Sequence, residues 1–411
     1  MSIFEKEVLQ PVRDALDGKV LRIPIHLERV SEVISLRKNI YTIVGGNTGS
    51  GKTSFVDDTF VLKPFQLWYK FKDTTDVTFR VLYRSMERRR SLKLTKWACW
   101  KMYQDHGILI DSETLLGYKK AKVSEAIWNI LVGARDWADM LLDYIDIRDG
   151  RTSPEDYNHW VTNHAIRNGT LYVSDTKGVY DFKQPGTYID TFSTGKEKTL
   201  ANGEKVQIVV VTHKGETITL RQNERHYFPN REKEITIVVG DHVGKFVGQT
   251  GLTSKKQIID KASEHNADFR DVFGYSPVAV SQFNRAIGDV QRMKFSDGDL
   301  SPQLEDFKDT GNLTEDADLV IALFNPYRYK SFDDNGMYKG YNIRDEMVNP
   351  FGHNRYRLIS ILKNSYGIDD VDFGLKFLGE VNDFTTLPKP GPDNQVTQEL
   401  QKVYREIQQG K

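Results

Sequence analysis

A glycine-rich octapeptide near the start of the chain carries the clearest chemistry in the sequence. Residues 46–53 read Gly-Asn-Thr-Gly-Ser-Gly-Lys-Thr and fit the pattern G-x-x-x-x-G-K-[ST], between a β-branched run and a helical stretch. Glycines let consecutive backbone N–H groups curl around a phosphate, and the positive end of the following helix adds to the attraction. The pattern predicts a phosphate-binding loop (P-loop) for ATP. The expected contacts come from Gly46, Gly49, Ser50, Gly51, Lys52 and Thr53.

A P-loop binds ATP together with Mg²⁺, so the sequence should also supply a carboxylate for the metal. We expect Lys52 to reach the β- and γ-phosphates and the hydroxyl of Thr53 to ligate Mg²⁺. A carboxylate on a neighbouring strand completes such a site. Asp241 directly follows the largely apolar run 235–240, and we interpret it as that carboxylate. Acids after apolar strands are common, so this prediction depends on the P-loop beside it.

Two further polar residues follow apolar runs in the same way. Glu87 comes shortly after the run 77–83, and Gln282 comes directly after the run 277–281. Because ligands of open α/β sheets lie at the carboxyl ends of the strands, both side chains are expected near the γ-phosphate. A carboxylate there can act as general base on the attacking water, and an amide can sense the phosphate. We therefore predict these roles for Glu87 and Gln282.

Short β-branched runs alternate with helical stretches from residue 39 onward. The expected strands are 39–44, 77–83, 171–174, 235–239, 277–281, 319–324, 358–362 and 371–377. The clearest expected helices between them are 92–103, 123–142 and 255–273. Several of the strands are continuously apolar, as expected when both faces of a parallel sheet are covered. The pattern predicts an α/β fold with a doubly wound, mainly parallel sheet.

One stretch departs from this alternation and two lie outside it. Residues 176–230 are rich in Gly, Thr and Asn, and the runs 206–212 and 217–220 flank a turn, which predicts a β-hairpin insertion on the main domain. We expect an N-terminal helical arm at 1–30, a core at 31–387 and a C-terminal tail at 388–411. The amphipathic stretch 4–17 is compatible both with packing on its own domain and with docking on a neighbouring subunit.

Composition narrows the class of protein. The 411 residues include 57 Lys+Arg and 57 Asp+Glu, and this balance argues against a generally basic nucleic-acid binder while allowing local basic patches. Cys99 is the only cysteine, which excludes an intrachain disulfide and a multi-cysteine zinc site and suits a reducing cytoplasm. We expect no signal peptide and no membrane span, because no apolar run approaches about 20 residues.

Five segments in order resemble the ATPase domain of the DnaB-type replicative helicases, most of all the versions found in bacterial viruses. The first is the P-loop at 46–53. Ser-Met-Glu at 85–87 resembles the family's S-L-E, and Asp-His at 241–242 resembles its metal-binding Asp with an aromatic neighbour. Ser-Gln-Phe-Asn-Arg at 281–285 resembles S-Q-L-N-R. Residues 306–318 resemble D-L-R-x-S-G-x-I-E-Q-D-A-D, the most specific of the five. The resemblance spans about 30–390, and 100–230 matches poorly.

The resemblance implies a RecA-like P-loop NTPase that forms rings, with a hexamer as the expected state, and moves along single-stranded DNA. It makes Glu87 the catalytic base, and it makes Gln282 the link between the γ-phosphate and the DNA-binding loops. It places a channel loop at 306–318 and a lysine, Lys363, that reaches the neighbouring subunit's ATP. The DNA contacts expected from the family's loop positions are Arg285, Arg292, Lys294, Lys308, Asp309 and Gly311. A basic run at 84–90, with Lys93 beyond it, is more often a solvated helix face.

Two departures from the family pattern change what is expected. The family's K-x-R supplies a lysine and an arginine finger to the neighbouring site, but residues 362–367 read Leu-Lys-Asn-Ser-Tyr-Gly, with Ser365 at the finger position. Either ATP turnover is slow, or Arg355, Arg357 or Arg328 substitutes, and the sequence leaves these open. Only about 30 residues precede the core, whereas cellular members have a helical domain there. Ring assembly is then expected to depend on the arm and on core contacts.

These observations lead to one expected function and two alternatives. We expect an ATP-hydrolysing DNA helicase that needs ATP and Mg²⁺, acts as a homo-oligomer on single-stranded DNA, and works in the cytoplasm, the bacterial host's if the protein is viral. A separate primase or polymerase is an open partner. A RecA-fold recombinase or annealing factor would form filaments instead of closed rings. A nucleotide-gated assembly protein would hydrolyse little ATP, as the missing finger allows.

Overall fold

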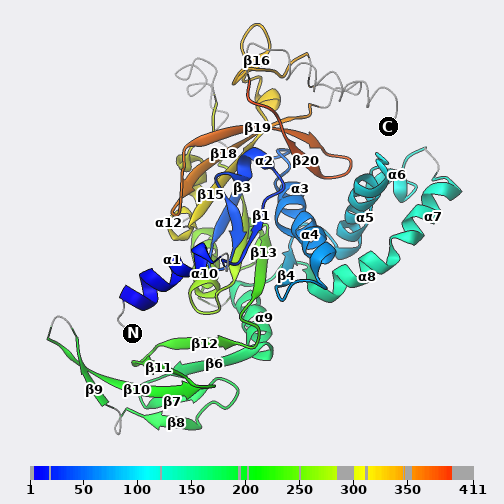
Figure 1. The fold of residues 1–411 in the computed structure, drawn as a ribbon. Coiled ribbons are helices and arrows are strands. Elements are labelled where there is room, and N and C mark those ends of the chain that lie inside the picture. Colours follow the sequence, from blue (N-terminus) through cyan, green and yellow to red (C-terminus); the bar gives the residue numbers. More distant parts are fainter. Residues whose placement is uncertain are drawn as a thin grey trace.

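A nine-stranded sheet forms the centre of the computed structural model (Figure 1). The structure describes residues 4–17, 20–120, 123–192, 196–200, 203–249, 251–284, 300–310, 313–345, 347 and 354–390. The strands of the central sheet are β3 (Thr42–Gly46), β4 (Thr78–Ser85), β5 (Ile145–Asp149), β13 (Glu234–Asp241), β14 (Ser276–Gln282), β15 (Leu319–Phe324), β18 (Tyr356–Asn364), β19 (Val371–Leu378) and β20 (Asp383–Thr386).

The order of the strands is β20-β19-β18-β15-β3-β14-β13-β4-β5. The strands from β15 to β5 run parallel to one another, and β18, β19 and β20 extend the sheet with antiparallel pairing. Every residue of β3 and β15 is buried, because both faces of the sheet are covered. The predicted mainly parallel α/β sheet is confirmed.

Helices cover the two faces of the sheet and produce two separate apolar layers. One face carries α3 (Lys52–Val56), the π-helical segment η2 (Asp57–Leu62), α4 (Lys63–Phe71), α5 (Arg90–His106) and α8 (Arg135–Tyr144). The helices α6 (Ser112–Leu115) and α7 (Glu125–Gly133) pack on α5. The other face carries α9 (Pro154–Arg167), α10 (Lys255–Asp271) and α12 (Leu313–Asp316). Segments α3, η2 and α4 follow one another without a break, so the P-loop is anchored to one long helical rod.

Two expected elements differ from the observed ones, and one observed strand was not expected. The expected helix 123–142 is two helices that meet at Ala134. The expected strand 171–174 exists as β6 (Gly169–Ser174), but it belongs to a small separate sheet and not to the central one. Strand β5 was not expected, because its alternation of apolar and charged residues marks a half-exposed edge strand instead of a buried run.

The β-insertion is larger than a hairpin and extends below the core in Figure 1. Its further strands are β7 (Gly178–Asp181), β8 (Tyr188–Thr191), β9 (Lys196–Thr199), β10 (Lys205–His213), β11 (Glu216–Leu220) and β12 (Arg225–Pro229). They form two sheets, β12-β6-β7-β8 and β11-β10-β9. The predicted hairpin is β10–β11, turning at Lys214 and Gly215, which both have positive φ. The insertion has its own apolar cluster, including Tyr172, Val209 and Phe228.

The N-terminal arm consists of η1 (Glu5–Leu9) and α1 (Gln10–Leu16). It extends away from the body in Figure 1, and its apolar side chains are exposed, with Phe4 at 60% and Leu16 at 76%. After the arm, β1 (Arg22–Pro24) pairs with β2 (Ser35–Arg37), and α2 (Glu28–Ser31) lies between them. The apolar stripe of the arm therefore does not pack on the described part of its own domain.

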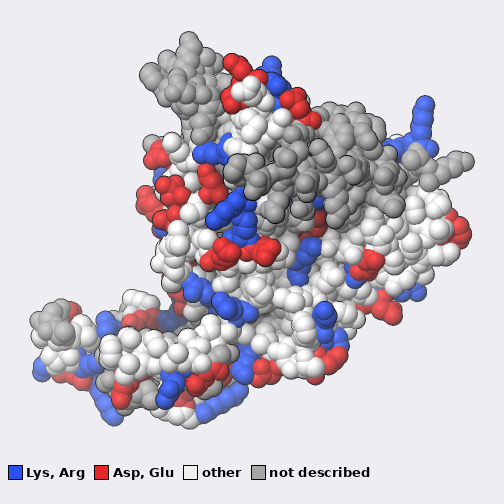
Figure 2. All heavy atoms as spheres, turned by 45° about the horizontal axis from the view of Figure 1, so that its top comes forward, with Lys and Arg blue, Asp and Glu red and all other residues white. Residues whose placement is uncertain are grey.

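Charged side chains of both signs are mixed on the surface. Lys and Arg alternate with Asp and Glu over the face shown in Figure 2, in line with the equal totals in the sequence. Within the described residues, none of the helices has the length and apolarity needed to cross a bilayer.

Candidate nucleotide-binding site

The P-loop connects the carboxyl end of β3 to the N-terminus of α3, as the sequence predicts. Gly49 and Gly51 have φ values of +79° and +96°, a region that residues with a Cβ rarely adopt. At Gly46, a Cβ would collide with the carbonyl oxygen of Leu323 on β15. The loop therefore needs glycine at these positions for its own shape, before any phosphate binds.

Lys52 lies folded back on the loop that precedes it. Its Nζ donates hydrogen bonds to the carbonyl oxygens of Gly46, at 2.9 Å, and Asn47, at 3.0 Å. Burial lowers the pKa of Lys52 to about 8, although the nearby carboxylates of Glu87 and Asp241 act in the opposite direction. The ammonium group thus lies in a partly dry site between the loop and two acids, where a phosphate would compete for its protons.

The lowered pKa of Lys52 predicts that ATP binding weakens as the pH rises above about 8. Below that pH the lysine already carries the charge that attracts the phosphates. Above it, the free protein must take up a proton to bind, and affinity should fall by up to about tenfold per pH unit. Calorimetric titration with ATP in two buffers of different ionisation enthalpy, at pH 7 and pH 9, measures this uptake.

The matched control is Lys52→Arg, whose guanidinium does not titrate in this range. Whatever affinity this variant retains should lose the pH dependence. A wild-type affinity that stays constant from pH 8 to pH 10 would contradict the prediction.

Thr53 and Asp241 meet although they are distant in the sequence. The Thr53 hydroxyl donates to Asp241 Oδ1 at 3.0 Å, which joins the start of α3 to the end of β13. Asp241 is fully buried, and this burial raises the pKa of its carboxyl group above the usual value. A hydroxyl and a buried carboxylate are hard oxygen donors of the kind that Mg²⁺ takes. They fit the predicted metal position, where phosphate oxygens and waters would complete the coordination.

A metal held in this way does not require a cage of protein ligands. The described ranges contain no group of three or more His, Cys, Asp and Glu side chains that could hold a metal ion. Mg²⁺ commonly uses one or two protein ligands and takes the others from substrate phosphates and water. The pair Thr53–Asp241 is consistent with this mode.

A buried ion pair lies directly behind the metal position, and the sequence did not reveal it. Lys93, on α5, is 1% exposed, and its Nζ donates to the two carboxylate oxygens of Asp57 at 3.0 and 3.1 Å. It also donates to the Tyr83 hydroxyl at 2.7 Å and lies 3.8 Å from Asp241. Trp97 Nε1 donates to Asp57 at 3.0 Å. Lys93 therefore belongs to the support of the site and not to a solvated helix face.

Glu87 and Gln282 lie at the carboxyl edge of the sheet, beside the P-loop. Glu87 is exposed, and Lys245 Nζ lies 3.7 Å from its carboxylate. The neighbouring backbone is fixed by the Met86 N–H, which donates to the Asp241 carbonyl at 2.6 Å. Gln282 Nε2 donates to the hydroxyl of Thr48, inside the P-loop, at 2.7 Å. The structure brings both side chains next to the phosphate-binding residues, and their roles stay predictions.

Lys363 lies at the opposite edge of the sheet, where the parallel strands begin. It pairs with Val320 near the start of β15, and its Nζ donates to the carbonyls of Thr314 and Glu315, each at 3.0 Å. Because the P-loop follows the carboxyl end of the neighbouring parallel strand β3, Lys363 points away from its own chain's ATP position. It can act only on another subunit's nucleotide, if it acts on one.

The three arginines left open by the sequence have different surroundings. Arg355 is buried and paired with Glu380, with Nη2 donating to Oε1 at 2.6 Å. Arg357 is also buried, and its Nε donates to the Ser50 carbonyl at 2.9 Å. Burial and the neighbouring Arg355 lower the pKa of Arg357 to about 9. Arg328 is exposed and donates to the Thr48 carbonyl at 2.8 Å.

Most of the expected DNA contacts cannot be placed. Arg285, Arg292, Lys294 and Gly311 lie outside the described residues. Lys308 and Asp309 belong to the 3₁₀ segment η5 (Leu304–Thr310), of which the structure describes the backbone at these positions but not the side chains. The start of this segment is well connected, because the Asn284 N–H donates to the Asp306 carbonyl at 2.9 Å.

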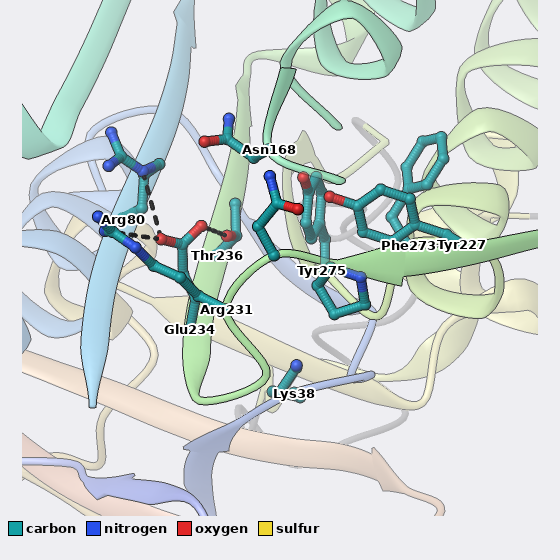
Figure 3. A pocket seen from close by; sticks show the side chains of 11 residues that line it. Lys38, Arg80, Asn168, Tyr227, Arg231, Glu234, Thr236, Phe273 and Tyr275 are labelled. Atoms are coloured by element: carbon teal, nitrogen blue, oxygen red, sulfur yellow. Dashed lines mark hydrogen bonds and ion pairs between the residues drawn. The ribbon is translucent and has the colours of Figure 1, made fainter. Parts of the chain in front are cut away.

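A cavity of about 280 Å³ lies at the amino-terminal edge of the sheet, where the insertion joins the core (Figure 3). Glu234, the first residue of β13, lies 3.7 Å from Arg80 Nε and 3.8 Å from Arg231 Nη1. Figure 3 shows this group on one wall and Tyr227, Phe273 and Tyr275 on the other. The cavity and the P-loop therefore occupy opposite edges of the sheet and are separate sites.

Comparison with known proteins supports the fold. No protein-family model matches the chain, and no curated protein sequence matches it. The solved structure of the ATPase domain of a phage helicase superposes with a TM-score of 0.57 at 15% identity, covering 94% of this chain and 100% of that one. A DnaB-like replicative helicase, described with its interactions with primase, superposes with a TM-score of 0.56 at 14% identity, covering 92% of this chain and 67% of that one. The chain thus has the RecA-like α/β fold of the ATPase domains of DnaB-type helicases.

Proposed function

We propose that this protein is an ATP-driven motor that assembles into rings, translocates on single-stranded DNA and separates duplex strands. The observation that carries the proposal is the meeting of Thr53 with Asp241 at 3.0 Å beside Lys52, while Gln282 reaches the P-loop from the neighbouring strand β14. The first contact fits a Mg²⁺–ATP site. The second gives the site a route to the segments that follow β14.

In the proposed reaction, ATP lies at the P-loop with Lys52 on its β- and γ-phosphates. Thr53 would bind Mg²⁺ directly and Asp241 would hold it through a water molecule. The metal would neutralise negative charge on the phosphate oxygens. The oxygen of a water molecule bonds to the γ-phosphorus while the bond between that phosphorus and the β–γ bridging oxygen breaks, releasing ADP. Glu87 accepts the proton of the water. Lys363 of the next subunit completes the site from across an interface.

The coupling between ATP and DNA is proposed to pass through the segment after β14. Gln282 contacts Thr48, and the next residue, Phe283, packs edge-to-face on Phe307 of η5 with ring centroids 5.0 Å apart. A Cβ at Gly45 would collide with the Phe307 ring, so η5 also touches the strand that leads into the P-loop. A shift of Gln282 towards the γ-phosphate would therefore move the backbone that carries Lys308.

Two features support assembly into a ring of identical subunits. The exposed apolar stripe of the arm, including Phe4, Val12 and Leu16, needs a partner surface. Lys363, at the edge opposite its own P-loop, is placed to act on a neighbour. We propose a hexamer acting in the cytoplasm. A separate primase is the proposed partner because one structure of similar fold is described with its interactions with primase, and a polymerase stays open.

The proposed function predicts strand separation that depends on the P-loop. A forked duplex with a labelled strand should be separated by the wild type in the presence of ATP and Mg²⁺, and Lys52→Ala should separate none above background. Electron microscopy in ATP and DNA should show closed rings. Filaments together with strand annealing would favour the recombinase alternative, and rings with negligible ATP turnover would favour the nucleotide-gated one.

A further inference from the structure

Two guanidinium groups of the same chain donate hydrogen bonds to backbone carbonyls of the P-loop. Arg328 donates to the carbonyl of Thr48 at 2.8 Å, and Arg357 donates to the carbonyl of Ser50 at 2.9 Å and more weakly to that of Gly49 at 3.4 Å. Both arginines therefore lie against the P-loop of their own chain.

The two arginines differ in the donors that they have left. Arg357 is buried, and its guanidinium also donates to the carbonyls of Asn354 and Tyr356, so its nitrogens are committed to the backbone. The exposed guanidinium of Arg328 makes one hydrogen bond to the part of the chain that the structure describes. A guanidinium has five N–H donors. Arg328 therefore keeps several donors that no described residue uses and that a ligand can take.

The backbone around Arg328 fixes its approach to the loop. Arg328 belongs to the short 3₁₀ segment η6 (Pro326–Tyr329), which directly follows β15 at the carboxyl edge of the sheet. Asn325 Oδ1 accepts the Arg328 N–H at 3.4 Å, and Lys330 ends the segment with a φ of +53°. A Cβ on Gly49 would come 2.5 Å from Arg328 Nη1, so the guanidinium lies against the top of the P-loop.

We propose that Arg328 is a catalytic residue that contacts the phosphates of the ATP bound to its own subunit. This inference rests on the proposed ATP hydrolysis. A guanidinium matches two phosphate oxygens at once, and its fixed charge would stabilise the charge that develops on the transferred phosphoryl group. Since it reaches the P-loop of its own chain, Arg328 supplies in cis the charge that an arginine at position 365 would have supplied to a neighbour. Ser365 is compatible with turnover for this reason.

The first test separates chemistry from binding. Arg328→Ala should lower kcat by about 10³-fold or more, the range for arginines that stabilise phosphoryl transfer, while the Kd for ADP changes by less than tenfold. Arg328→Lys should not restore kcat, because an ammonium cannot bind two oxygens in the same plane. Arg344→Ala, at an exposed arginine paired with Asp345, is the control and should hydrolyse ATP normally. A normal kcat in Arg328→Ala would overturn the inference.

The second test separates cis from trans action. Arg328→Ala and Lys52→Ala subunits, co-expressed with different tags and purified on both, give mixed oligomers. If Arg328 acts in cis, every site in them lacks either its own arginine or its own lysine, and turnover should not exceed that of the separate variants. Recovery of turnover would show trans action and overturn the inference. Lys363→Ala mixed with Lys52→Ala should recover turnover, because Lys363 is placed to act on a neighbour.

The two proposals fail in different ways. The tests of Arg328 measure ATP turnover and ADP binding, not strand separation. A wild type that hydrolyses ATP without separating DNA strands would therefore rule out the proposed motor but not the proposed role of Arg328. Conversely, normal turnover in Arg328→Ala would rule out the role of Arg328 but not the proposed motor function. If the protein purifies as a monomer, the kcat of Arg328→Ala alone decides the inference, because a monomer offers only cis action.

Discussion

Replacing Glu87 with glutamine is expected to lower kcat for ATP hydrolysis by about 10²- to 10⁴-fold, the usual contribution of a positioned general base. Glutamine keeps the size and much of the hydrogen bonding of the side chain but cannot accept the proton of the attacking water. Glu87 lies exposed at the carboxyl edge of the sheet, near enough to Lys52 and Asp241 to influence the pKa of both. Steady-state turnover with a coupled assay measures the loss.

The binding of ATP should distinguish this effect from general damage. A Glu87→Gln protein should bind a fluorescent ATP analogue with a Kd within about threefold of the wild type, since the phosphates are held by the P-loop. Glu216→Gln, on the exposed strand β11 of the insertion, is the matched control and should be normal in both assays. Normal turnover in Glu87→Gln would remove this residue from the chemistry.

Replacing Lys93 with methionine is expected to lower the free energy of unfolding by about 3–5 kcal/mol, the usual result of removing one partner of a buried ion pair. The substitution leaves the carboxylate of Asp57 buried without its cation and takes a donor from the Tyr83 hydroxyl. Because Lys93 also lies 3.8 Å from Asp241, the loss should extend to the metal position. Urea unfolding followed by tryptophan fluorescence measures it.

Two controls test whether charge burial is the cause. Lys256→Met removes an exposed pair with Asp260 on α10 and should change stability by no more than about 0.5 kcal/mol. The double variant Asp57→Leu/Lys93→Met removes both buried charges and should be more stable than Lys93→Met alone. A Lys93→Met protein within about 1 kcal/mol of the wild type would show that the pair is not a major support.

The central sheet could largely be predicted because burial on both faces gives its inner strands an unbroken apolar sequence. Strand β5 escaped this reasoning because an edge strand keeps one side in water and alternates in sequence. The division between α7 and α8 had a signal in Gly133, a residue that weakens helices, but the good helix formers Ala134 and Arg135 follow it. The size of the insertion was underestimated because β6 has the same apolar appearance as a strand of the main sheet.

The residues of the site that are close together in the sequence could be predicted, and those that meet only in the fold could not. The P-loop consists of eight consecutive residues, and the position of Asp241 at the end of an apolar run was enough to predict it as the partner of the P-loop. The buried position of Lys93 could not be predicted, because a lysine close to a run of arginines is expected on a solvent-exposed helix face. Arg328 and Arg357 could not be ranked either, because their contacts with Thr48 and Ser50 join residues about 300 positions apart.

Steady-state ATP hydrolysis with and without single-stranded DNA, with Lys52→Ala as the blank, tests whether DNA binding is coupled to the P-loop. We expect DNA to stimulate turnover by the wild type strongly. The segment around Lys308, which we propose to contact DNA, is linked to the P-loop by the packing of Phe307 on Phe283 and by the hydrogen bond from the adjacent Gln282 to Thr48. Lys52→Ala should show no turnover in either condition. If DNA does not change the turnover of the wild type, the proposal of a DNA-translocating motor is wrong, and the protein is an ATPase that acts on a different partner.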